Sequence, residues 1–305
     1  ALVGDVGAKP DSALVLNDMN YTEVDAAVIL GDAFYAEGRY RVFEHWANQT
    51  VTSLARIPHA AVVGNHDYLG DMDFFHAWFH PISPSHALRY AFRHGPALFL
   101  ALSSEWHDFH DGHQTHWLQQ KLANVDRRAT PWVIVMFHRP TVTAGFHAAP
   151  DAFRHIIHPL LHRYGVDFVF GGHNHQFEMT KPLGADGHVA PGLRGSGDCA
   201  ADPYVDARAP TFVTAGTGGS ALYEDEQGPD GPDWQLLDAH HFGFVHTEFG
   251  YVTQRTATYA RVTWRRFTAS KDGQDAGPIH VGVDVCYIKT LAGAPAVAAA
   301  ASSSS

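Results

Sequence analysis

The chain has 305 residues, 45% of them hydrophobic, which is enough for a sizeable core in one large α/β domain or two smaller ones, and we favour one domain. Its net charge of −11 comes from 32 acidic and 21 basic residues, which argues against a nucleic-acid groove or an anionic membrane as the main partner. No apolar run approaches the ~20 residues of a membrane span, and the N-terminus lacks the pattern of a signal peptide. An anionic substrate would therefore need a local cationic site, such as bound metals.

Short apolar runs with high β-propensity predict strands at 26–30, 60–63, 98–102, 132–137, 166–170, 211–215, 259–264 and 280–288. Segments with helical spacing of apolar residues predict helices at 39–56, 72–79, 114–125 and 152–164. Strand and helix alternate in the first half, whereas the later strands follow one another with little helix between them. This order predicts an α/β fold with two packed sheets flanked by helices.

The remaining segments predict loops and a tail. Residues 184–206 and 224–231 are rich in Gly, Pro and Asp, which favours long surface loops within one domain. The domain is expected to span 1–291, because 292–305 is a low-complexity stretch of mainly Ala and Ser that packs poorly. A strand normally needs more residues than Ala1–Val3, so we expect further sequence upstream of the first motif.

The cysteines and glycosylation sequons bear on the compartment. Two cysteines, Cys199 and Cys286, exclude a disulfide scaffold and leave open whether they form a single bridge. Asn20 and Asn48 each begin an Asn-X-Thr sequon, which matters only on a eukaryotic secretory route. These features favour a secreted, extracellular or cell-surface glycoprotein.

Five polar clusters directly follow strand-like runs: GDVG at 4–7, GDAFY at 31–35, GNHD at 64–67, VMFH at 135–138 and GHNH at 172–175. A lone Gly-Asp turn is usually structural, because both residue types favour turns. Five such clusters at strand ends are hard to produce by turn chemistry. Since ligand sites in open α/β sheets are built at the carboxyl ends of strands, the clusters are expected to form one site.

These clusters resemble, in order, the signature of the purple acid phosphatases within the calcineurin-like metallophosphoesterase superfamily. Most of that superfamily has a metal-binding His two residues after the first Asp, whereas purple acid phosphatases have a Gly there, as at Gly7, and use a Tyr, as at Tyr35. Nearly the whole chain up to the tail resembles the catalytic domain of the plant-type high-molecular-weight members, without the β-sandwich domain that precedes it in them. The resemblance implies a four-layer αββα sandwich of two mixed β-sheets.

The resemblance also implies two metal ions. One ion would take three anionic oxygens and one imidazole, which favours Fe(III), from Asp5, Asp32, Tyr35 and His175. The other would be a divalent Zn, Mn or Fe(II) ion with a less anionic ligand set, namely Asp32, Asn65, His138 and His173. The implied reaction is attack of a metal-bound hydroxide on a phosphate monoester at mildly acidic pH.

Two further histidines are candidate catalytic residues. His66 follows Asn65 and is the first candidate for orienting the phosphate or protonating the leaving group, the alternative being a histidine hydrogen-bonded to Asp67. His147 lies in the loop where relatives carry a substrate-facing histidine, the alternative being a flexible loop residue.

Other histidine groups carry less weight. Spacing alone does not supply metal geometry for His107, His110, His113 and His116. A solvated helix face explains His155, His158 and His162 equally well. Residues 176–179 read Gln-Phe-Glu-Met where plant-type relatives commonly have Ala-Tyr-Glu-Arg, which leaves the metal ligands intact and puts substrate preference in question.

Three functions remain open on the sequence. The leading one is an acid phosphatase acting on phosphorylated small molecules or proteins. A phosphodiesterase or nucleotide pyrophosphatase of the same superfamily would share the two-metal core and differ in pocket shape. The third is an extracellular structural glycoprotein that retains the metal site.

Overall fold

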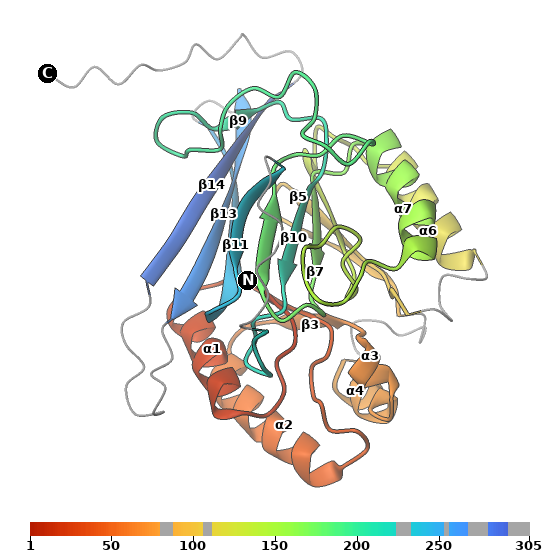
Figure 1. Ribbon diagram of the computed structural model, residues 1–305, viewed down its shortest axis with the longest axis vertical. Coiled ribbons are helices and arrows are strands. Elements are labelled where there is room, and N and C mark those ends of the chain that lie inside the picture. The colour runs from red at the N-terminus through yellow and green to blue at the C-terminus, as the bar shows by residue number, and fades with distance from the viewer. Residues whose placement is uncertain (80–87, 106–111, 224–232, 253–255, 268–279, 292–305) are drawn as a thin grey trace, which may run out of the picture.

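The computed structural model describes residues 1–79, 88–105, 112–223, 233–252, 256–267 and 280–291. Within them, two seven-stranded sheets pack face to face, and helices cover the outer faces (Figure 1). This arrangement confirms the expected four-layer αββα sandwich. None of the described helices is both long and apolar enough to span a bilayer.

The first sheet combines parallel and antiparallel pairing. In sheet order its strands are β3 (His59–Val62), β2 (Ala27–Leu30), β1 (Leu2–Val3), β12 (Phe242–Tyr251), β13 (Ala257–Phe267), β14 (His280–Thr290) and β9 (Tyr204–Val205). β1, β2 and β3 run parallel, so all three carboxyl ends lie at one edge. β12, β13 and β14 form an antiparallel meander beside them.

The second sheet is also mixed. In sheet order its strands are β11 (Trp234–Asp238), β8 (Phe177–Thr180), β10 (Thr211–Ala215), β7 (Phe168–Gly171), β6 (Trp132–Met136), β5 (Ala97–Ala101) and β4 (Tyr90–His94). The central strands β5, β6, β7 and β10 run parallel. Their carboxyl ends therefore form a second edge at which loops converge.

Alternation along the strands builds three apolar layers. In β2, Val28 and Leu30 face the second sheet, whereas Ala27 and Ile29 face the helices. The helices on the first sheet are α1 (Pro10–Tyr21), α2 (Tyr40–Leu54) and α4 (Met72–Phe79), and those on the second are α6 (His113–Ala123) and α7 (Asp151–Arg163). A single helical turn, α3 (Asn65–Tyr68), follows β3.

All eight predicted strands and all four predicted helices are present, with ends shifted by up to three residues. The sequence did not predict α1, α3, β1, β4, β8, β9, β11 and β12. Leu2 and Val3 form a strand of two residues, in which Leu2 pairs with Val28 on one side and Val245 on the other, and the expectation of further sequence upstream stays a prediction. The segment 184–206 is mostly loop, and the predicted loop at 224–231 and tail at 292–305 lie outside the described residues.

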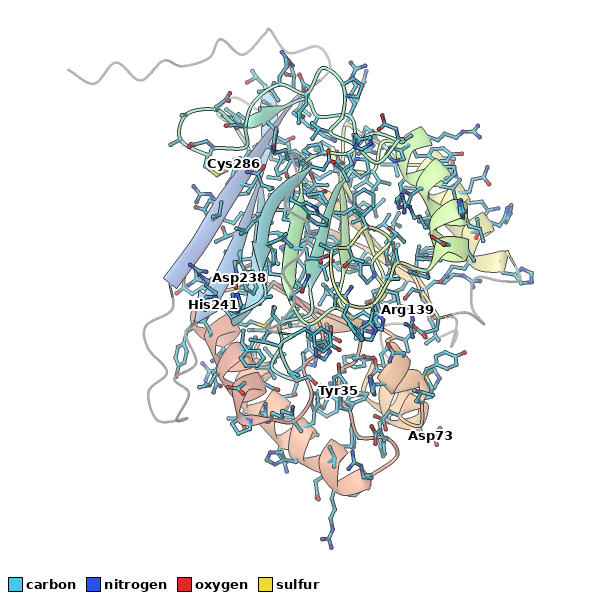
Figure 2. The ribbon with its side chains drawn as sticks, in the orientation of Figure 1. Tyr35, Asp73, Arg139, Asp238, His241 and Cys286 are labelled. Atoms are coloured by element: carbon cyan, nitrogen blue, oxygen red, sulfur yellow. A yellow bond between two sulfur atoms is a disulfide. The ribbon has the colours of Figure 1, made fainter. Side chains whose placement is uncertain are left out.

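A disulfide and a buried carboxylate tie β14 and β11 to the rest of the domain. A disulfide between Cys199 and Cys286, with Cα atoms 4.8 Å apart, joins the 184–206 loop to β14 (Figure 2). Asp238 in the second sheet accepts hydrogen bonds from Trp264 Nε1 (3.1 Å) and Arg266 Nη1 (2.9 Å) in the first. Burial raises the pKa of Asp238, but these donors and the neighbouring His241 outweigh burial, so the pKa lies below its usual range.

Candidate metal centre

The five polar clusters converge where the carboxyl ends of the two sheets meet. Asp5, Asp32 and Asn65 follow β1, β2 and β3 of the first sheet. His138 follows β6 of the second sheet, and the pair His173 and His175 follows β7. A backbone hydrogen bond from Gly4 N to Ala215 O, 2.7 Å long, joins the two edges.

One group contains three of the four residues expected to hold Fe(III). The Tyr35 hydroxyl donates to Asp5 Oδ1 at 3.0 Å and lies 3.0 Å from His175 Nε2. His175 Nε2 is in turn 3.3 Å from Asp5 Oδ1. Phenol, carboxylate and imidazole thus present their donor atoms to one point, and the Asp5 side chain is fully buried.

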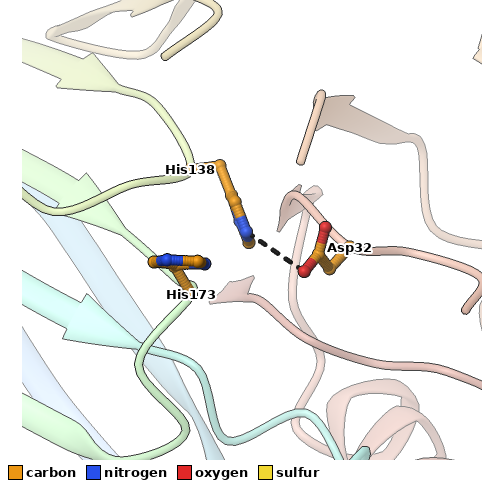
Figure 3. A group of neighbouring side chains, drawn as sticks. All are labelled: Asp32, His138 and His173. Atoms are coloured by element: carbon orange, nitrogen blue, oxygen red, sulfur yellow. Dashed lines mark ion pairs between the residues drawn. The ribbon is translucent and has the colours of Figure 1, made fainter. Parts of the chain in front are cut away.

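A second group contains the residues expected to hold the divalent ion. His138 Nε2 lies 3.2 Å from both Asp32 Oδ2 and Asn65 Oδ1, and potential ligand atoms of Asp32, His138 and His173 fall within 4.8 Å of one another (Figure 3). His138 Nδ1 lies 2.8 Å from Leu30 O. Because a carbonyl only accepts, Nδ1 carries a hydrogen and Nε2 is aimed at Asp32 and Asn65.

The charges in these groups suit cations. Burial raises the pKa values of Asp5 and Asp32, but His175 and His138 respectively outweigh it, so both pKa values are lowered and both groups are carboxylates. Burial and then these carboxylates raise the pKa of Tyr35, which keeps the phenol neutral until a cation stabilises its anion. The donor set, two buried carboxylates with a phenol, an amide and imidazoles, fits one oxygen-rich and one nitrogen-richer metal site.

His138 and His173 titrate differently. Burial lowers the pKa of His138, but Asp32 and Asp5 outweigh it and raise the pKa to about 10. Burial and the charges of His138 and Arg139 lower the pKa of His173 to about 2, so His173 is a neutral imidazole. A neutral imidazole is the form that binds metals.

The backbone is strained at four of the predicted ligands. Asp5, Asp32, Tyr35 and His173 have φ values of 59°, 51°, 50° and 69°, and they are half of the eight non-glycine residues with positive φ in the described ranges. The residue before Asn65 has to be a glycine, because a Cβ at Gly64 would lie 2.2 Å from Asp32 Oδ1. Strained residues of this kind cluster at functional sites.

Two carboxylates that sequence reasoning missed hold the segment 32–38. Asp67 accepts hydrogen bonds from Ala33 N and Gly64 N, both 2.9 Å long, and burial with the nearby Asp32 charge raises its pKa to about 8. Asp71 accepts from the amides of residues 36, 37 and 38 at 2.8, 2.9 and 2.6 Å. Their partners within the segment 32–38 are more than 30 residues away in sequence, so no local motif signals this role.

The two candidate catalytic histidines contact different ligand groups, His66 the group of Tyr35 and His147 the group of His173. The His66 ring is 4.4 Å from the Tyr35 ring, and its Nδ1 is buried with no hydrogen-bond partner among the described residues. The His147 ring stacks on His173 at 4.4 Å, and its Nε2 lies 3.2 Å from the Tyr223 hydroxyl. Tyr223, which the sequence did not single out, also stacks flat on the imidazole of His175, with ring centroids 4.5 Å apart.

Asn174, between His173 and His175, fixes the loop that carries His147. Its Oδ1 accepts from His147 N at 2.9 Å, and its Nδ2 donates to His147 O at 3.0 Å and to Thr143 Oγ1 at 2.7 Å. His147 is therefore anchored by its backbone rather than free in a flexible loop.

Two of the residues 176–179, Gln176 and Glu178, contribute to holding the same loop by hydrogen bonds. Gln176 Nε2 donates to Glu178 Oε1 at 2.5 Å, and this oxygen also accepts from Thr143 Oγ1 and Ala144 N at 3.0 and 2.9 Å. Met179 lies in the core between the sheets, 1% exposed. In this chain Gln176 therefore supports the carboxylate that holds the loop at residues 143 and 144.

Among the described residues, the other histidines that the sequence singled out belong to no group that could hold a metal ion. His116 Nε2 lies 2.9 Å from Gln120 Nε2, and His107 and His110 fall outside the described residues. His155 is exposed on α7. His158 is instead half-buried against Phe212 and contacts Thr141, so a solvated face does not describe it fully.

Residues 1–177, more than half of the chain, match the model of the calcineurin-like phosphoesterase family. The chain belongs to this family.

The curated relatives and solved structures that resemble this chain include purple acid phosphatases. Purple acid phosphatase 21 of Arabidopsis thaliana is 27% identical over 233 residues, covering 72% of this chain and 49% of the relative. Fe(3+)-Zn(2+) purple acid phosphatase 12 of the same plant is 26% identical over 288 residues, covering 87% and 59%. A purple acid phosphatase from yellow lupin (Lupinus luteus) seeds shares the fold, with a TM-score of 0.71 at 18% identity over 95% of this chain and 53% of that one. This chain thus spans about half the length of these relatives.

Proposed function

We propose that residues 1–291 are the catalytic domain of a purple acid phosphatase that hydrolyses phosphate monoesters. The observation that carries the proposal is the convergence of two donor groups, one with a phenol and one rich in imidazoles, at the meeting edge of the sheets. A fold without chemistry has no need to bury carboxylates, a phenol and histidines together.

Two ions would be held, with Asp32 as the shared ligand. Fe(III) would bind Asp5, Asp32, Tyr35 and His175, and a divalent Zn, Mn or Fe(II) ion would bind Asp32, Asn65, His138 and His173. When bound, such a pair activates water and neutralises the charge of the phosphoryl group.

The side chains around the centre would orient the substrate and move protons. His147 is anchored by Asn174 beside His173, where its ring can hydrogen-bond a phosphate oxygen. His66 lies beside Tyr35, and its Nδ1 has no hydrogen-bond partner among the described residues, which suits it to protonate the leaving alkoxide.

We further propose that the protein is exported. The disulfide between Cys199 and Cys286 favours an oxidising compartment. Asn20 and Asn48 are both exposed, so a glycan on either could point into solvent.

Metal analysis together with a substrate panel tests this function. Protein purified without chelators should contain about two metal ions per chain, one of them iron, and should hydrolyse an aryl phosphate at mildly acidic pH. Tyr35→Phe should abolish the visible absorption band of the iron-loaded protein. His66→Ala and His147→Ala should each lower turnover about a hundredfold without loss of metal.

The panel also separates the alternatives. Faster hydrolysis of diesters than of monoesters would identify a phosphodiesterase. Bound metals without hydrolysis of either class would favour the structural glycoprotein, and protein without metals would refute the two-metal proposal.

A further inference from the structure

Arg139 places a fixed positive charge inside the candidate centre. It directly follows His138, and its Nη1 lies 2.9 Å from His173 Nε2. Figure 2 shows Arg139 at the same end of the sheets as Tyr35.

A buried carboxylate fixes the orientation of this guanidinium. Arg139 Nε donates to Glu105 Oε1 at 2.9 Å and Nη2 donates to Glu105 Oε2 at 3.3 Å, which is a two-point contact. Glu105 is only 8% exposed. A two-point contact sets the plane of the guanidinium as well as its position.

The backbone around this pair is fixed in turn. Arg139 N donates to Ser104 Oγ at 2.8 Å, and Glu105 N donates to Ser103 Oγ at 3.2 Å. The buried Gln114 side chain bonds both the N and the O of Ser103, at 2.8 and 2.7 Å. Four buried residues, three in the loop after β5 and one in α6, therefore support the arginine directly or through Glu105.

The contacts leave part of the guanidinium unused. An arginine has five N–H donors, of which Glu105 takes two and His173 faces one. The other two have no acceptor among the described residues, and the side chain is 30% exposed. Two oriented donors at the rim of a metal centre match the oxygens of a phosphate group.

We propose that Arg139 binds the substrate phosphate and, through its charge, favours phosphate monoesters over diesters. The inference rests on the proposed function, since it concerns the same site. A monoester dianion carries more charge and one more terminal oxygen than a diester, so a fixed cation stabilises it more. If Arg139 only neutralises Glu105, its removal would leave phosphate binding unchanged.

The test uses a variant that removes both charges. Replacing Arg139 alone would strand a buried carboxylate, so Arg139→Gln is combined with Glu105→Gln. Arg139→Lys keeps the charge and loses the two-point geometry, and it carries the test if the double variant does not fold. Arg128→Gln is the matched control, because Arg128 is exposed and lies outside the centre.

Three quantities are measured on metal-loaded protein: metal per chain, the Kd for inorganic phosphate by calorimetry, and kcat/KM for one monoester and one diester. In the double variant we expect unchanged metal content, a Kd for phosphate raised about tenfold or more, and a monoester-to-diester kcat/KM ratio lowered about tenfold. Because it loses the two-point geometry, Arg139→Lys should raise the Kd for phosphate about threefold or more and raise KM with kcat largely retained, and the control should match the unmodified protein.

The outcomes separate the two proposals. If the unmodified protein holds two metals and binds phosphate, but the double variant (or Arg139→Lys, if the double variant does not fold) binds phosphate within twofold of it, the role of Arg139 is refuted alone. If the unmodified protein holds no metal or binds no phosphate, the proposed function fails, and the inference fails with it.

Discussion

Replacing Asp71 by Ala perturbs the segment that carries Asp32 and Tyr35 without touching a predicted ligand. The Asp71 carboxylate accepts hydrogen bonds from three successive amides, those of residues 36 to 38. The amide of Ala36 is fully buried, and its bond to a charged acceptor is worth about 2 kcal/mol. Water can replace the carboxylate at the other two, so each contributes about 1 kcal/mol and the whole substitution costs roughly 4 kcal/mol.

Urea unfolding of the metal-free protein measures this cost directly. Asp73→Ala is the matched control, since Asp73 is exposed on α4 two residues further on (Figure 2), and should change the free energy of unfolding by less than about 0.5 kcal/mol. Asp71→Ala should also broaden or weaken the visible band of the iron-loaded protein, because Tyr35 loses its anchor. Equal unfolding free energies for the two variants would show that the carboxylate does not hold the segment.

Three other substitutions have defined outcomes. The pKa of Asp238 is lowered in the folded state, so its carboxylate stabilises the fold fully above the unfolded pKa of ~3.9, and this stabilisation is lost as pH falls through the folded pKa. Asp238→Asn should therefore cost about 2 kcal/mol at pH 7 and make the free energy of urea unfolding less dependent on pH in the acid range. An unchanged pH dependence of this free energy would contradict the prediction. Replacing Cys199 and Cys286 by Ser removes a bridge across 87 residues and should lower the free energy of unfolding by about 4 kcal/mol, whereas equal stability with and without reductant would argue against the bridge. Asn174→Ala releases His147 and should lower kcat about tenfold at constant metal content, and full turnover would mean that the loop needs no anchor.

Elements with an uninterrupted local pattern could be predicted from the sequence. The strand Thr211–Ala215 was predicted to the residue, because it is a short apolar run between turn residues and is buried on both faces. Helix α1 was missed because Ser12 and Asp18 break its apolar stripe. Both are nevertheless buried, with Ser12 Oγ donating to Val6 O and Asp18 facing Arg265 across to β13. Distant partners satisfy these polar groups, and the local pattern does not contain that information.

The residues of the candidate metal centre likewise separate into those that could be predicted from the sequence and those that could not. The predicted ligands follow strands directly, so their convergence could be inferred from parallel strand order. The residues that support them could not, because Asp71 lies 35 positions from Ala36 and Glu105 lies 34 positions from Arg139. Which carboxylate meets which loop depends on how the two sheets pack, and only the folded chain specifies that.

The strain at the centre argues for chemistry over a purely structural role. Asp and His tolerate positive φ better than most residues, so Asp5, Asp32 and His173 are mild exceptions, whereas Tyr35 at φ 50° is a costly one. Such residues cost on the order of 1–3 kcal/mol each, and they persist only where surrounding contacts over-determine them. Asp71 supplies those contacts beside Tyr35 through three amides. A scaffold that needed only the fold would gain stability from glycine or asparagine at position 35. A bulky tyrosine held there, with its hydroxyl against Asp5 and His175, is what the proposed metal site with a phenolate ligand predicts.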